Sequence, residues 1–250
     1  MRSIITEESL RAELPGHAVT VYETTDSTNT RLRALENTPD GAVICARGQS
    51  AGRGRHGKSF SSPTGAGVYF STSVCRNIPK ERAWALTFFA AAAVAHTLES
   101  FSLEVQIKWV NDIYVGSRKV CGILTEIELD GGYVRRAVIG IGINLRKTEL
   151  PPEVAARATS LEEQGVIADE TQIVARTVRE LYRLTNAYDI PGVIDEYRRR
   201  DMLLGREITY ERDGMLFTGK AAGIEDDGSL AVISDGQRLS LGSGMVSIKI

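Results

Sequence analysis

The sequence predicts an α+β protein of 250 residues in which a larger first part is followed by a small β-barrel. Strand patterns and helical patterns alternate irregularly over the first two hundred residues or so. After Leu204 the helical patterns stop, and short strands follow one another with Asp-Gly turns between them, which is typical of a small barrel. We therefore place a domain boundary near residue 203 and expect one domain over residues 1–202 and a second over residues 203–250.

The elements before the first long helix follow from capping and turn residues. Asp26, Ser27 and Thr28 are good helix N-caps and precede a helical pattern. Residues 48–67 contain six glycines and Pro63, so they are expected to form a loop. The expected elements are a short helix at Ser9, a strand at 19–22, a helix after Ser27, and strands at 41–46 and 68–74.

Helices and paired strands are expected in the rest of the chain. Residues 81–100 are apolar almost all round, which indicates a buried helix, and residues 171–188 have the single apolar face of an amphipathic helix. A shorter helix ends at Arg200, and turn sequences at 116–118 and 130–132 predict hairpins. The strands of the first part are expected at 105–109, 112–115, 120–129 and 134–143, and those of the barrel at 207–211, 215–224, 230–234 and 246–250.

The overall composition excludes several classes of protein. The chain has 30 basic and 32 acidic residues, so it lacks the basic field of a non-specific nucleic-acid-binding protein. Its 3 cysteines form no CxxC pair and its 3 histidines are isolated, so neither a disulfide framework nor a metal held by protein ligands is expected. Neither a signal peptide nor a membrane-spanning segment is predicted, and we expect a cytoplasmic protein.

One stretch of the chain departs from this balance of charges. Residues 41–80 contain no Asp or Glu, and their basic side chains give a local charge of +6. The basic residues are Arg47, Arg53, Arg55, Lys58, Arg76 and Lys80. A stretch of this kind is a candidate site for an anionic ligand.

The glycine-rich part of this stretch, GRGRHGKS at 52–59, matches two phosphate-binding patterns by letter. It satisfies GxGxxG and also GxxxxGKS, but both motifs need a helix that starts at the glycines. Pro63 and Gly65 would break such a helix, so neither a Rossmann site nor a P-loop is expected. Arg53 and Arg55 can instead close over an anion with charge-assisted hydrogen bonds, although this segment alone would also fit a solvated basic loop.

With these arginines in view, the sequence resembles the biotin protein ligase family. The loop is similar to the family signature GRGRRG, with His56 in place of the last arginine. The segment KWVND at 108–112 resembles KWPND, with Val110 in place of proline. The other matching segments, in family order, are DSTN at 26–29, Gln49, RKVCGIL at 118–124 and GIGIN at 140–144. The likeness covers the whole chain, including the C-terminal barrel.

The resemblance implies both a fold and a reaction. The fold would be a mixed sheet backed by helices, like that of class II synthetases, with an SH3-like C-terminal domain. The reaction would join biotin and ATP into biotinyl-5′-adenylate and release pyrophosphate. It would then pass biotin to one lysine of a biotin carboxyl carrier protein, as in acetyl-CoA carboxylase. Magnesium (Mg2+) would arrive with ATP.

The resemblance also assigns roles to residues, segment by segment. Lys119 would bridge the biotin carboxylate and the α-phosphate. The expected catalytic residues are Lys119, Arg53, Arg55 and Asp112. The expected biotin-binding residues are Ser27, Thr28, Asn29, Gln49, Gly52, Arg53, Gly54, Arg55, Lys119 and Gly122. The expected ATP-binding or adenylate-binding residues are Arg53, Arg55, Phe60, Lys108, Asn111 and Asn144.

Elementary chemistry agrees with the choice of cations. A carboxylate is already ionised at neutral pH, so adenylation needs no general base but does need cations that let the carboxylate approach a triphosphate. The transfer step needs a neutral amine, and because free lysine has a pKa of ~10.4 we expect Asp112 to orient that amine or accept its proton. The glycine-rich loop is expected to be mobile without ligand and ordered with it, which would protect the adenylate from water.

Two alternatives stay open on the sequence. A lipoate or octanoate ligase or transferase shares the fold, and a non-catalytic module would bind biotin or a partner only. We expect a ligase without repressor activity, because 25 residues precede Asp26, which is too few for the winged helix domain of bifunctional members. The exposed edge of the sheet could pair with the carrier domain or, in a homodimer, with a second copy of the chain.

Overall fold

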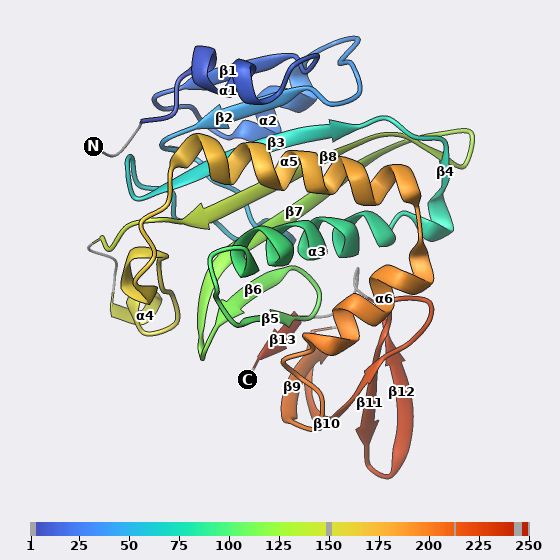
Figure 1. Cartoon of the computed structure of the whole chain (residues 1–250). Helices are drawn as coiled ribbons and strands as arrows, with labels where there is room; N and C mark the ends of the chain where they lie inside the picture. The colour runs from blue at the N-terminus through green and yellow to red at the C-terminus, as the bar shows by residue number, and fades with distance from the viewer. Residues whose placement is uncertain (1–3, 149–151, 213, 243–246, 250) are drawn as a thin grey trace.

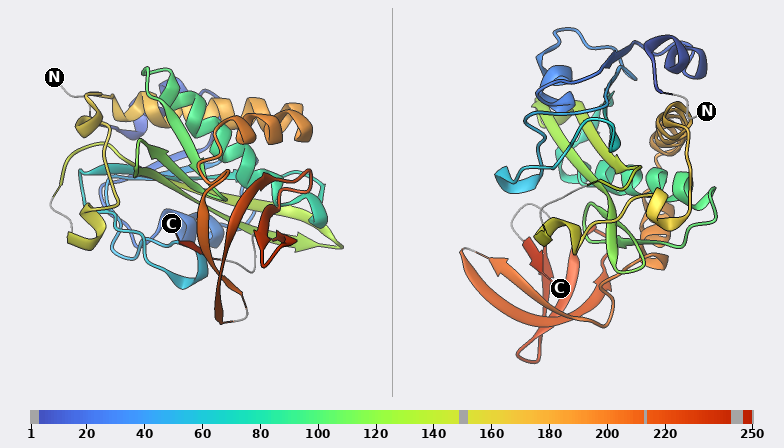
Figure 2. Two further views of the ribbon diagram at one scale, coloured as in Figure 1. Left: turned by 90° about the horizontal axis from the view of Figure 1, so that it is seen from below. Right: turned by 90° about the vertical axis from the view of Figure 1, so that its left-hand side faces the viewer.

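The computed structural model describes residues 4–148, 152–212, 214–242 and 247–249. Its larger part is a sheet that carries helices, and a smaller sheet formed by the C-terminal strands lies below it (Figure 1). Helices α3 (Ala85–Glu99) and α5 (Glu170–Ala187) pack side by side on one face of the larger sheet. Helix α2 (Thr28–Ala34) lies on the opposite face (Figure 2).

The larger sheet has eight strands among the described residues and is mixed. Strands β1 and β2 are parallel, whereas the other paired strands are antiparallel. The expected mixed sheet backed by helices is therefore confirmed. In spatial order the strands are β1 (Val19–Tyr22), β2 (Val43–Ala46), β3 (Gly67–Val74), β8 (Tyr133–Asn144), β7 (Arg118–Asp130), β6 (Asp112–Val115) and β5 (Val105–Lys108), with β4 (Ile78–Pro79) beside β8.

Helix α3 forms the centre of the core. Its alanine-rich sequence is buried on nearly every side, because the sheet covers one side while α5 and α6 (Ile190–Arg199) cover the others. The predicted helix at 81–100 is thus confirmed, although α3 begins at Ala85, after a 3-10 turn, η2 (Lys80–Arg82). The remaining helical elements are α1 (Glu7–Glu13), α4 (Pro152–Ala155), η1 (Arg55–Gly57) and η3 (Glu162–Gln164).

The C-terminal strands form a second, antiparallel sheet of five strands among the described residues. In spatial order they are β12 (Gln237–Leu241), β11 (Leu230–Ser234), β10 (Met215–Ile224), β9 (Glu207–Arg212) and β13 (Ser247–Lys249). The sequence prediction omitted β12, whose Gln, Arg and Ser side chains give it little of the composition of a strand. Val246 and Ile250 of the predicted last strand lie outside the described residues.

A turn of the small sheet is fixed against the larger part of the molecule. The indole Nε1 of Trp109 donates a buried hydrogen bond of 3.1 Å to the carbonyl of Gly228. Nearby, Arg198 at the end of α6 forms an ion pair of 2.7 Å with Asp226. The small sheet is therefore anchored directly behind the segment that joins β5 to β6. No described helix is long and apolar enough to cross a membrane.

Candidate active site

A cavity of about 1280 Å³ opens between the start of α2, the loop that joins β2 to β3, and strands β6, β7 and β8. We call residues 48–66 of that connection the glycine–arginine loop. Seven of the described residues that line the cavity are Lys or Arg, and one is an acid, Asp112. The cations are Arg53, Arg55, Lys58, Lys108, Lys119, Arg157 and Arg206. The cavity is therefore a strongly cationic site in a chain of slightly negative net charge.

The glycine–arginine loop folds back on itself and does not start a long helix. The amide of Gly54 donates to the carbonyl of Lys58 at 2.7 Å, and the amide of Phe60 donates to the carbonyl of Gly52 at 2.9 Å. Between these bonds lies the single 3-10 turn η1, after which residues 58–66 run irregularly into β3. This geometry agrees with the prediction that the glycines form neither a P-loop nor a Rossmann turn.

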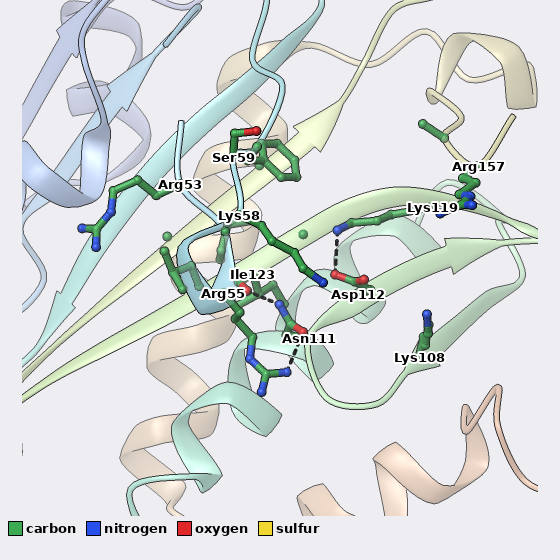
Figure 3. A pocket seen from close by; sticks show the side chains of 18 of the residues that line it. Arg53, Arg55, Lys58, Ser59, Lys108, Asn111, Asp112, Lys119, Ile123 and Arg157 are labelled. Atoms are coloured by element: carbon green, nitrogen blue, oxygen red, sulfur yellow. Dashed lines mark hydrogen bonds and ion pairs between the residues drawn. The ribbon is translucent and has the colours of Figure 1, made fainter. Parts of the chain in front are cut away.

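The two arginines of the loop point to different sides of the site (Figure 3). Arg53 forms an ion pair of 3.1 Å with Glu126 of β7, and Arg55 donates a hydrogen bond of 3.4 Å to Oδ1 of Asn111. In the sequence, no acidic residue stands near these two arginines, since residues 41–80 contain no Asp or Glu. Folding brings an acid to Arg53 from 73 positions further along the chain.

Burial acts on two of the cations. It lowers the pKa of the Arg55 guanidinium, while the nearby charge of Asp112 opposes that effect. It also lowers the pKa of the Lys108 ammonium, and the charge of Asp112 again opposes that effect. The neighbouring charges of Lys119, Lys58 and Arg157 act in the same direction as burial. Cations that crowd one another in this way favour binding of an anion that relieves their repulsion.

The start of α2 forms one wall of the cavity with buried polar side chains. Ser27 is the N-cap and accepts a hydrogen bond of 3.5 Å from the amide of Thr30. Thr28 donates its backbone N–H to Oε1 of Gln49 at 2.9 Å, which ties the helix to the glycine–arginine loop. Asn29 accepts a hydrogen bond of 2.6 Å from Ser71. These residues cap a helix and line the cavity at the same time.

Lys119 occupies the middle of the site. Its Nζ lies 2.7 Å from Oδ1 of Asp112 (Figure 3) and 5.4 Å from the centre of the Phe60 ring. Asn111 is held beside this pair, because its Nδ2 donates to the carbonyl of Ile123 at 2.6 Å. The predicted catalytic lysine and aspartate are thus in direct contact.

Two glycines make room for the ring of Phe60. A Cβ atom at Gly122 would lie 2.8 Å from Cε2 of Phe60, and one at Gly142 would lie 2.5 Å from Cε1. Neither distance is compatible with ordinary packing, so both positions need glycine while the ring is inside the site. Tyr69 packs edge-on against the same ring, with centroids 6.3 Å apart.

Two of the predicted site residues do not line the cavity. Gly52 is buried within the loop, where a Cβ atom would clash with the carbonyl oxygen of Phe60 and would be 2.6 Å from Oγ of Ser62. Asn144 ends β8 and donates its Nδ2 to the carbonyl of Thr159 at 3.0 Å. The other predicted residues line it together, namely Ser27, Thr28, Asn29, Gln49, Arg53, Gly54, Arg55, Phe60, Lys108, Asn111, Asp112, Lys119 and Gly122.

Sequence reasoning missed several residues of the cavity wall, and Arg157 is the clearest case. The amide of Lys119 donates to the carbonyl of Arg157 at 2.8 Å, and the amide of Thr159 donates to the carbonyl of Lys119 at 2.8 Å. These bonds form an isolated parallel bridge between Lys119 of β7 and Ala158. A side chain that reaches the site through such a bridge has no motif around it, so no local signal could identify it.

The described residues contain no cluster of three or more His, Cys, Asp or Glu side chains placed to hold a metal ion. The oxygen donors in the middle of the cavity are the carboxylate of Asp112 and the amide of Asn111. One carboxylate and one amide are too few to hold a divalent ion alone, but they are enough to support one that keeps its waters and phosphate ligands.

Comparisons with known proteins agree with this geometry. Residues 21–144 match the model of the biotin/lipoate A/B protein ligase family. The biotin–[acetyl-CoA-carboxylase] ligase of Mycobacterium tuberculosis is 32% identical over 267 residues, which cover 98% of this chain and 96% of that protein. The bifunctional ligase/repressor BirA of Bacillus subtilis is 30% identical over 230 residues, covering 88% of this chain and 71% of that protein.

A solved structure shows the same similarity to biotin protein ligases. The biotin protein ligase from Aquifex aeolicus in complex with biotin and ATP superposes with a TM-score of 0.80 and 26% identity, covering 93% of this chain and 98% of that one. The similarity therefore extends over nearly the whole chain in sequence and in structure. This chain belongs to the biotin/lipoate A/B protein ligase family, and the relatives it matches are biotin protein ligases.

Proposed function

We propose that this chain is a biotin protein ligase that activates biotin with ATP and transfers it to a lysine of a biotin carboxyl carrier protein of acetyl-CoA carboxylase. The observation that carries the proposal is the cavity in which seven cationic side chains face one carboxylate. Such a site suits a substrate carboxylate together with a nucleotide triphosphate. The names of the relatives, which specify biotin, ATP and acetyl-CoA carboxylase, select this chemistry among ligases of the fold.

The first step is electrostatic in character. A carboxylate oxygen of biotin attacks the α-phosphorus of ATP, the bond to the β-phosphate oxygen breaks, and pyrophosphate leaves. No proton moves, so the catalytic task is to hold two anions in line and to stabilise the charge on the transferring phosphate. Lys119 at the centre of the cavity, with Arg53 and Arg55 from the glycine–arginine loop, performs that task, and Lys108, Asn111 and Phe60 contact the nucleotide.

The uncharged end of biotin lies against α2. Ser27, Thr28, Asn29 and Gln49 present hydroxyl, amide and backbone groups that can pair with the N–H and C=O groups of the ureido ring. Gly54 and Gly122 line the cavity and let the chain approach the ligand closely, whereas contact between Gly52 and biotin requires the loop to move. Asn144 lies beyond the cavity wall, so contact with adenine requires that its bond to Thr159 be exchanged for a bond to the base.

The second step transfers biotin to an amine. The neutral amine of the carrier lysine attacks the carbonyl carbon of the adenylate, AMP leaves with the bonding electrons, and the amine loses a proton. Asp112 is the carboxylate in the cavity that can orient this amine or accept its proton. Its contact with Lys119 would have to open while it does so.

Magnesium is part of the nucleotide substrate in this proposal. Asp112 and Asn111 would contact an ion whose other ligands are phosphate oxygens and water. We also propose that the chain forms two domains, a first of residues 1–202 and an SH3-like second of residues 203–250. The ligase is proposed to act in the cytoplasm. The exposed edge of the larger sheet would receive the carrier domain or a second copy of the chain.

The decisive experiment is biotin-dependent ATP–pyrophosphate exchange with wild-type protein and two arginine variants. Arg53→Ala removes a cavity cation and should lower exchange by about 100-fold. Arg76→Ala is the matched control, because Arg76 belongs to the same acid-free stretch and pairs with Asp40 at 3.0 Å but does not line the cavity. Exchange with lipoate or octanoate in place of biotin would favour the related ligases of this fold. Biotin binding without any exchange would show a non-catalytic module.

A further inference from the structure

Glu126 of β7 connects the glycine–arginine loop to the wall of the cavity. Its carboxylate accepts hydrogen bonds from Nδ2 of Asn29 at 2.9 Å, from Nη1 of Arg33 at 2.8 Å and from Nη1 of Arg53 at 3.2 Å. Asn29 and Arg33 belong to α2, and Arg53 belongs to the loop. One carboxylate therefore joins three elements at the edge of the site.

The surroundings of this carboxylate make it more than a surface ion pair. The side chain of Glu126 is only 16% exposed, whereas that of Arg53 is 45% exposed. A largely buried acid with two arginine partners is strongly held, and Arg33 still compensates its charge when Arg53 moves away. Arg53 is thus the movable partner, and Glu126 is the fixed one.

Glu126 also determines which way the amide of Asn29 faces. A carboxylate can only accept hydrogen bonds, so the atom of Asn29 beside it must be the nitrogen. The amide oxygen then points to Ser71, which donates to it at 2.6 Å. A glutamine at position 126 could present either a donor or an acceptor. The amide nitrogen of Asn29 would then be held only by its longer bond of 3.3 Å to the carbonyl of Leu124, so the constraint on Asn29 would be weaker.

We propose that Glu126 is a positioning residue for the biotin site, which holds Arg53 beside the cavity and fixes the amide of Asn29 before biotin binds. The inference rests on the proposed function, because it assigns Arg53 and Asn29 to biotin. A side chain that is already held in its binding position loses less freedom on binding, so biotin affinity should depend on Glu126 even without direct contact.

The test compares two neighbouring glutamates of β7 in the pyrophosphate exchange assay. Glu126→Gln should raise the KM for biotin about tenfold and change kcat by less than about threefold. Glu128→Gln is the matched control, since Glu128 lies two positions along the same strand and forms an ion pair of 2.7 Å with Arg136. It should leave the KM for biotin within about twofold of wild type.

A double-mutant cycle separates positioning from a general effect on the fold. If Glu126 acts largely through Arg53, then Glu126→Gln should raise the KM for biotin much less in an Arg53→Ala background than in wild type. Equal effects in both backgrounds would overturn the proposal, as would a KM that is unchanged or lowered in the single variant. Glu126→Asp keeps the charge on a shorter side chain and should give an intermediate KM, which tests the idea even if Glu126→Gln folds poorly.

The exchange activity of the wild-type protein distinguishes a failure of the proposed function from a failure of the role of Glu126. If wild type shows no biotin-dependent exchange, the proposed function fails. If wild type exchanges normally while Glu126→Gln and Glu128→Gln behave alike, only the role of Glu126 fails.

Discussion

Lys119 is the residue at which the contacts of the site converge. Its ammonium touches Asp112 and lies over the ring of Phe60, while its backbone holds the segment that contains Arg157. In the free protein the charge of Lys119 is therefore directed at a carboxylate inside the cavity. A substrate carboxylate or phosphate has to compete with that contact or share it.

Replacement of Lys119 tests this arrangement. Lys119→Gln keeps a polar side chain, one atom shorter, but removes its charge, so the rate of biotin-dependent pyrophosphate exchange should fall at least about 100-fold. The neighbouring Arg118→Gln is the control, because Arg118 pairs with Glu163 at 3.1 Å and does not line the cavity. Similar losses in both variants would argue against a special role for Lys119.

The sequence predicts a residue of the cavity correctly when that residue stands within a family motif. Arg53, Arg55 and Lys119 stand in motifs of the family, and all three line the cavity. Glu126 and Arg157 could not be found in this way. Glu126 acquires its role because β7 passes under the loop, and Arg157 acquires its role through backbone bonds to Lys119. Both effects arise from tertiary contacts between distant parts of the chain.

At the level of elements, the glycine–arginine loop combines a fixed base with an exposed tip at residues 56–59. Its base is tied to α2 through Gln49 and Thr28, and its fold-back is closed by bonds between Gly52 and Phe60. Arg53, just before this tip, is held by contacts with Glu126 and the loop's own backbone. A loop built in this way can open locally while the sheet remains folded.

Limited proteolysis should report that opening. Cleavage within residues 48–65 should be roughly tenfold slower with biotin and ATP than without them, because ligand binding favours the closed loop. Cleavage at the β7–β8 turn, residues 131–132, is the internal control and should not respond to ligand. Equal cleavage of the loop in both conditions would contradict the expected ordering.

The elements themselves follow from the sequence where their patterns are long or well capped. Helices α3 and α5 were predicted from an apolar run and from an amphipathic face, and Asp169 caps α5 by accepting from Gln172 at 3.0 Å. Strand β12 was missed because its stability comes from pairing with β11 and not from its own composition. The hairpins at 116–118 and 130–132 were predicted from the sequence because hairpin turns need specific residue types.

On the scale of the whole molecule, the two sheets meet at Trp109 and Gly228. Trp109 belongs to the segment that supplies Lys108, Asn111 and Asp112 to the cavity, and its indole donates to a turn of the small sheet. The ring of Trp84 also packs closely against Gly228. The small sheet therefore supports one side of the candidate active site from behind.

Trp109→Phe removes the donor to Gly228 but keeps an aromatic ring. Leaving a buried carbonyl without its partner should cost about 1–2 kcal/mol and lower Tm by roughly 2–8 °C. Amide hydrogen exchange should become faster in residues 225–232, which surround the contact. Trp84→Phe is the control, because Trp84 contacts Gly228 by packing. Amide exchange in residues 225–232 should change less in Trp84→Phe than in Trp109→Phe. A larger change in Trp84→Phe would contradict the role of the hydrogen bond from Trp109.

The acid-free stretch also has a consequence for the order in which the chain is made. As residues 41–80 leave the ribosome they carry six positive charges and no acid of their own. Arg47 obtains Glu23 at once, at 2.7 Å in the final fold, but Arg53 must wait for Glu126, and the buried Glu170 that lies 3.6 Å from Arg47 comes later still. The anion site thus acquires its shape only after β7 has been synthesised, and in the growing chain Arg53 is without its acid until then.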